Sequence, residues 1–94
     1  MKENSALSTL FRTYLHQDYD LRYATVADAL AGFRADATVA ERARVVEEID
    51  DLLASHPDDA QLYRELRARG FIFYPPREGE TTADWLRRAR AAVR

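Results

Sequence analysis

A chain of 94 residues with a net charge of −2 is long enough for one domain around one hydrophobic core. Hydrophobic residues make up 47% of it, which argues against disorder, and the lack of cysteine excludes disulfides, thiolate metal sites and a thiol nucleophile. Charge is uneven, since residues 1–60 hold 12 acidic and 6 basic side chains while residues 61–94 hold 4 and 8.

Neither a signal peptide nor an apolar run of membrane-spanning length is visible, so the sequence predicts a cytoplasmic protein with no membrane partner. No repeat, low-complexity tract or linker divides the chain. We therefore expect a single domain over residues 1–94, in which residues 1–4 form a flexible N-terminus.

Two helices are predicted in the N-terminal third. Ser5 is a suitable cap for the first, which is expected to run to about His16. Its apolar residues recur at helical spacing, and they are Leu7, Leu10, Phe11, Tyr14 and Leu15. Thr25 is the expected cap of the second helix, which carries Val26, Ala29, Leu30 and Phe33 on one side and ends near Ala35.

The longest predicted helix opens with Thr38 and Glu41, which have the spacing of a capping box, and runs to about Ser55. We expect its inward face to consist of Val39, Ala43, Val46, Ile49, Leu52 and Leu53. A fourth helix follows, with either Pro57 at its first position or Asp58 as its cap, and Gly70 is well placed to end it.

The four apolar residues Phe71–Tyr74 are too few for a helix and have no second strand to pair with. They predict a short extended segment across the helices, ended by Pro75 and Pro76. We expect the side chains of this segment and of Trp85 to pack in the core rather than to bind a ligand. Thr81 and Thr82 then cap a fifth helix with Trp85 facing inward. The predicted fold is all-α, a compact domain of about five helices.

Catalytic and metal sites are not indicated. His16, Asp18 and Asp20 lie where a helix ends, so no helix face holds their side chains together, and a histidine or aspartate at such a position has a plain structural role. The glycines are isolated, which excludes a phosphate-binding loop, and no nucleophile motif is present. We expect no enzyme activity, no metal and no cofactor.

The densest acidic cluster is Glu47, Glu48, Asp50 and Asp51 on the third predicted helix. Two interpretations are open: a solvated helix surface, or a docking patch for a basic partner. The net negative charge argues against nucleic acid as that partner.

Four segments share, in order, a pattern known from one group of proteins. They are Tyr14–Tyr23, similar to a "YFHQDWD" opening, Ala27–Phe33, similar to a short helix ending in Phe, Val46–Leu53, similar to a long acidic helix, and Tyr74–Leu86, similar to a "YxPP…G…S/T…WL" ending. Together they resemble the immunity proteins of contact-dependent growth inhibition (CDI) systems, the CdiI-like family of small bacterial proteins. The resemblance covers residues 7–93, with Leu15 and Tyr19 where the family often has Phe and Trp.

The resemblance implies a non-catalytic immunity protein that stays in the cytoplasm and neutralises the toxic C-terminal domain of a cognate effector by non-covalent binding. Many such toxins are nucleases with basic clefts, and the protein itself would be a monomer or weak homodimer. We hypothesise that the docking surface combines acidic residues after the first predicted helix with those of the third. Its residues are Asp18, Tyr19, Asp20, Glu47, Glu48, Asp50 and Asp51. The alternative is a small helical transcriptional or signalling adaptor.

Overall fold

The computed structural model describes residues 5–15 and 23–94, and within these residues every regular element is a helix. The helices are α1 (Ala6–Thr13), α2 (Val26–Asp36), α3 (Val39–Ser55), α4 (Asp59–Ala68), the 3₁₀ helix η2 (Pro75–Glu78) and α5 (Thr82–Val93). The all-α prediction with five main helices is confirmed. The expectation of a flexible N-terminus at residues 1–4 falls outside the described residues.

The helices begin where the capping residues of the sequence predict. Thr25, Thr38 and Thr81 each accept a hydrogen bond from the backbone amide three residues later. The Glu41 carboxylate accepts the backbone N–H of Thr38 in return, which completes the predicted capping box. Between the two alternatives for α4, Asp58 is the cap, because its carboxylate accepts the amide of Ala60 at 3.0 Å.

Two boundaries differ from the prediction. Helix α1 ends at Thr13 rather than near His16, and Tyr14 follows it as the C-cap. Pro75–Glu78 forms a 3₁₀ turn, where the prediction had only Pro75 and Pro76 ending the extended segment, because two prolines supply the fixed φ that such a turn needs. Gly79 ends this turn with φ = 78°, a conformation that a side chain would strain.

The predicted inward face of α3 is confirmed for Val46, Ile49, Leu52 and Leu53, which are buried or packed against the core, and is wrong in the first half of the helix. Val39, expected in the core, is 73% exposed, and Ala43 is exposed as well, whereas Val45 is buried beside Ile49. The helix carries apolar residues on more than one side, so periodicity alone left its orientation open. Packing against α1 and α5 selects the side that carries Val45.

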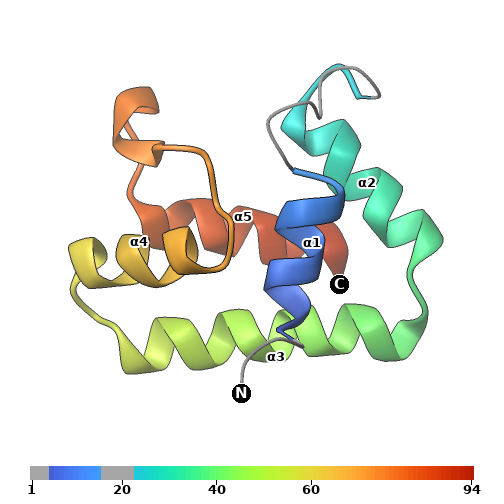
Figure 1. The fold of residues 1–94 in the computed structure, drawn as a ribbon, viewed down its shortest axis with the longest axis horizontal. Coiled ribbons are helices and arrows are strands. Elements are labelled where there is room, and N and C mark those ends of the chain that lie inside the picture. The colour runs from blue at the N-terminus through green and yellow to red at the C-terminus, as the bar shows by residue number, and fades with distance from the viewer. Residues whose placement is uncertain (1–4, 16–22) are drawn as a thin grey trace.

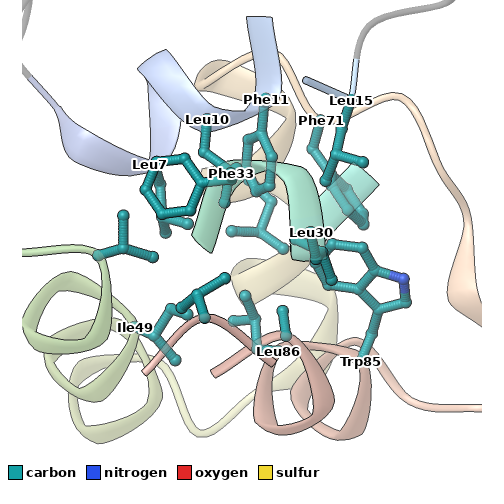
Figure 2. Close-up of a cluster of buried hydrophobic side chains, with 14 of the residues drawn as sticks. Leu7, Leu10, Phe11, Leu15, Leu30, Phe33, Ile49, Phe71, Trp85 and Leu86 are labelled. Atoms are coloured by element: carbon teal, nitrogen blue, oxygen red, sulfur yellow. The ribbon is translucent and has the colours of Figure 1, made fainter. Parts of the chain in front are cut away.

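Helix α5 is the element on which the others assemble, since it packs against α2, α3, α4 and η2 (Figure 1). Helix α3 runs along the lower edge of the view, and α1 rises from its middle. The core between them joins α1, α2, α3 and α5 (Figure 2), and its labelled members are Leu7, Leu10, Phe11, Leu15, Leu30, Phe33, Ile49, Phe71, Trp85 and Leu86.

The rings of Phe11, Phe71 and Trp85 form the aromatic centre of this core. Phe71 lies 5.2 Å from Phe11 and 4.8 Å from Trp85, measured between ring centroids. Contacts of this kind each add about 0.5–1.5 kcal/mol beyond the burial of apolar area. The prediction that Trp85 and Phe71 serve packing is therefore confirmed.

The remaining residues of the segment Phe71–Tyr74 do not all pack inward. Phe73 is half-buried, while Ile72 is 46% exposed and Tyr74 is 50% exposed. An extended chain points successive side chains in opposite directions, so it can bury only every second residue of such a run. The prediction of core packing is thus wrong for Ile72 and Tyr74.

Candidate partner-binding surfaces

Glu48, one of the four acids on α3, is bonded inside the protein. Its carboxylate accepts hydrogen bonds from Ser5 Oγ at 2.5 Å, from the Leu7 amide at 3.0 Å and from Arg69 Nε at 2.8 Å. Burial alone would raise the pKa of this carboxyl, but the three hydrogen bonds outweigh burial and hold the pKa below its usual range. Glu48 therefore joins α1, α3 and the end of α4.

Asp50 is also engaged, at the surface between α3 and α5. Arg90 donates from Nε to Oδ1 at 2.8 Å and from Nη2 to Oδ2 at 3.2 Å. The two parallel bonds fix the orientation of both side chains. Arg90 therefore ties α5 to α3.

Glu47 and Asp51 are the two acids of this cluster whose carboxylates remain available for contact with a partner. Both are exposed, and within residues 5–15 and 23–94 neither forms an ion pair or a side-chain hydrogen bond. They are four residues apart on α3, so they lie on one side of the helix. We call Glu47 and Asp51 the acidic face of α3.

The other half of the expected docking surface, Asp18, Tyr19 and Asp20, lies outside the described residues, as does His16. On either side of these residues, Tyr14 and Tyr23 are half-buried and pack against the core, with their ring centroids 6.3 Å apart. Gly32 lets the ring of Tyr23 lie against α2, because a Cβ at this glycine would stand 2.7 Å from Tyr23 Oη.

The described residues contain no group of three side chains suited to hold a metal ion. His56, the histidine among them, lies 3.9 Å from a Glu65 carboxylate oxygen. In the same part of the chain, no helix is long and apolar enough to cross a membrane.

A second surface, which sequence reasoning missed, lies where η2 and the extended segment before it meet α4 and α5. It is a groove of about 860 Å³, and its lining includes Ile72, Tyr74, Arg77, Glu78 and Trp85. We call it the aromatic groove. The sequence did contain a signal for this surface, namely the apolar run Phe71–Tyr74 before two prolines. A run of this kind in an extended conformation must leave alternate side chains facing solvent.

Comparisons with known proteins agree on one family. A family model described as "CdiI immunity protein" matches residues 3–93. A solved structure described as a CdiA-CT/CdiI complex from Y. kristensenii 33638 contains a chain with 30% sequence identity. The similarity covers 95% of this chain and 96% of that chain, with a TM-score of 0.87. A comparison with curated proteins gives no match.

Proposed function

The chain belongs to the CdiI immunity protein family, and we propose that it binds and neutralises the C-terminal toxin domain of a cognate CdiA protein. The observation that carries this proposal is the match over residues 3–93, together with a fold that follows the Y. kristensenii chain over 95% of the sequence. That relative was solved in complex with CdiA-CT, so this fold is compatible with such a partner.

Immunity proteins of this family are non-enzymatic toxin inhibitors, so family membership confirms the expectation that the chain is not an enzyme. It also decides against the alternative of a transcriptional or signalling adaptor. The cytoplasm is the location we propose, because an inhibitor that acts by binding must be present where a delivered toxin domain arrives.

For the docking surface we propose the acidic face of α3, Glu47 and Asp51. Their carboxylates are exposed and unpaired among the described residues, so a basic partner can reach them without breaking internal bonds. Glu48 and Asp50 support this face from within by holding α1 and α5 against α3. A toxin with a basic, phosphate-binding cleft, such as a nuclease, would fit an acidic surface of this kind.

Binding to the purified cognate toxin domain tests the proposal directly. We expect a stable complex, and rescue of growth when both proteins are produced in one cell. A toxin domain that stays unbound and lethal would overturn the assignment for that pair, whatever the effect of variants on α3.

A further inference from the structure

Asp50 lies at the border of the acidic face of α3. It follows Glu47 by three residues, so the two carboxylates are neighbours on the helix. Both residues line a hollow of about 350 Å³ where α3 meets the end of α5. The Asp50 side chain is 49% exposed. By position alone, Asp50 would offer a third carboxylate to a partner that docks on Glu47 and Asp51.

Arg90 on α5 withholds this third carboxylate. It donates to both oxygens of Asp50, from Nε at 2.8 Å and from Nη2 at 3.2 Å. A cation of a partner would have to compete with this bidentate arginine for either oxygen. From a greater distance the two opposite charges of the pair cancel, so Asp50 adds little to the attraction of a basic partner.

The charge that α3 presents without Asp50 is small. Arg44, Glu47 and Asp51 are spaced three and four residues apart, so they share the exposed side of the helix. Within residues 5–15 and 23–94, none of the three forms an ion pair. One guanidinium and two carboxylates give this side a net charge of −1, and a free Asp50 beside them would raise it to −2.

Across the hollow the charge changes sign. Arg42 and Arg94 line it together with Glu47, and in the described part of the chain neither arginine pairs with an acid. Arg42 precedes Glu47 by five residues, which places the two side chains roughly 140° apart around the helix. With Arg90, these arginines form a positive border, and the acidic face therefore ends at the hollow.

We propose that Arg90 determines how far the acidic face extends, and with it which basic partners the chain accepts. This inference rests on the proposed function. By cancelling the charge of Asp50, Arg90 leaves Glu47 and Asp51 as the attractive groups. Specificity comes from repulsion as well as attraction. The partner that fits is a toxin domain with a compact basic patch, because positive charge that continued over α5 would meet arginines.

Four proteins test the role of Arg90: the wild type, R90Q, D50N and D50N/R90Q. Their association with the purified toxin domain is measured by stopped-flow mixing at several salt concentrations. R90Q exposes the charge of Asp50, so its association rate constant at low salt should rise about twofold, with a steeper dependence on ionic strength. D50N leaves Arg90 without its acid and should lower the rate constant about twofold. D50N/R90Q carries neither charge and should resemble the wild type.

Two matched controls separate position from net charge. R64Q makes the same change in net charge as R90Q at an exposed site on α4, and D28N makes the same change as D50N at an exposed site on α2. Neither residue lines the hollow, so both variants should associate at nearly the wild-type rate. Circular dichroism verifies that each variant is folded.

A decalysine peptide serves as a basic probe that does not depend on the toxin. R90Q should bind it about twofold more tightly than R64Q at low salt, because only R90Q adds a free carboxylate beside Glu47. The gain with this probe would show that Arg90 restrains binding to basic surfaces in general.

The outcomes distinguish this inference from the proposed function. Equal association rates for R90Q and R64Q would overturn it, as would a double variant that keeps the rate of either single variant. A wild-type chain that leaves the toxin domain unbound would refute the proposed function, and the decalysine comparison would then decide on Arg90. Equal decalysine binding by R90Q and R64Q overturns the inference.

Discussion

Arg69 donates a hydrogen bond from Nε to the Glu48 carboxylate at 2.8 Å and so ties the C-terminal end of α4 to the middle of α3. Both side chains are mostly buried, with 19% exposure each. Arg69 also donates from Nη1 to the Glu65 carboxylate at 3.0 Å, which fixes the guanidinium plane. Glu48 and its immediate neighbour Glu47 therefore have opposite roles, one inside the fold and one facing solvent.

Replacing Glu48 by glutamine should destabilise the protein. The charged acceptor for Ser5, Leu7 and Arg69 is lost, and the arginine keeps its charge in a mostly buried position. We expect the free energy of unfolding to fall by about 2 kcal/mol in urea titrations. The control E47Q, one position away on the exposed side, should change it by less than about 0.5 kcal/mol. Equal effects would contradict the internal role of Glu48.

Acid should destabilise the fold through Glu48 and Asp59. Burial alone would raise the pKa of Asp59, but the amides of Thr82 and Ala83, each donating to the carboxylate at 3.0 Å, outweigh burial and lower the pKa. The pKa of Glu48 is lowered as well. A carboxyl with a lowered pKa in the folded state adds stability above the pKa of the unfolded chain, and this stability is lost as the pH falls through the folded-state value.

The free energy of unfolding should therefore be nearly constant near neutral pH and decline below about pH 5. Urea titrations at a series of pH values measure this decline. The double variant E48Q/D59N is less stable at neutral pH, and its stability should depend less on pH in the acid range. A double variant with the slope of the wild type would show that other carboxyls are responsible.

Reversing the charges on the acidic face of α3 should slow association with the toxin domain. For E47K/D51K we expect the association rate constant at low salt to fall by about tenfold, with a weaker dependence on ionic strength, because electrostatic steering is removed. Stopped-flow mixing at several salt concentrations measures both quantities.

The matched control is D28K/D84K, which makes the same change in net charge at exposed positions of α2 and α5. It should leave the association rate nearly unchanged, since its acids lie outside both candidate surfaces. If both double variants slow association equally, net charge and not the position of Glu47 and Asp51 determines the rate.

Gly32 and Tyr23 should be energetically coupled. A Cβ at Gly32 would lie 2.7–2.9 Å from three atoms of the Tyr23 ring, so G32A must displace this ring. In the wild type the displacement should offset or exceed the roughly 1 kcal/mol that alanine contributes over glycine within a helix. In a Y23A background the obstacle is gone, and G32A should stabilise the protein. A double-mutant cycle should give a coupling of at least about 1 kcal/mol, and additive effects would contradict the contact.

Much of the fold could be predicted because its helix starts are encoded locally. Thr25, Thr38 and Thr81 each lie three residues before an amide that they cap, and no distant part of the chain is needed to recognise them. Which residues the first half of α3 buries was not predictable in this way. Val39 and Val45 lie on different sides of the helix, and only the packing of α1 and α5 decides which side is buried.

For the candidate sites, too, local sequence patterns could be recognised but contacts between distant residues could not. Four acids on α3 could be recognised as a cluster, but adjacent acids look alike in a sequence, and only contacts from Ser5 and Arg69 mark Glu48 as internal. The pairing of Asp50 with Arg90 joins residues 40 positions apart, which no local pattern reveals. The aromatic groove was hidden by a run of four apolar residues, in which the alternation of an extended chain cannot be seen.

The partners of Glu48 also bear on how the chain folds during synthesis. Helix α1 has eight residues, too few to be stable alone, and Ser5 and Leu7 reach Glu48 across 43 and 41 positions of sequence. Because α1 precedes α3 in the chain and leaves the ribosome before it, α1 must wait for α3 before it can form its lasting contacts. A ribosome stalled before residue 48 would hold α1 unfolded, and the N-terminal segment would be exposed to proteases until the middle of the chain emerges.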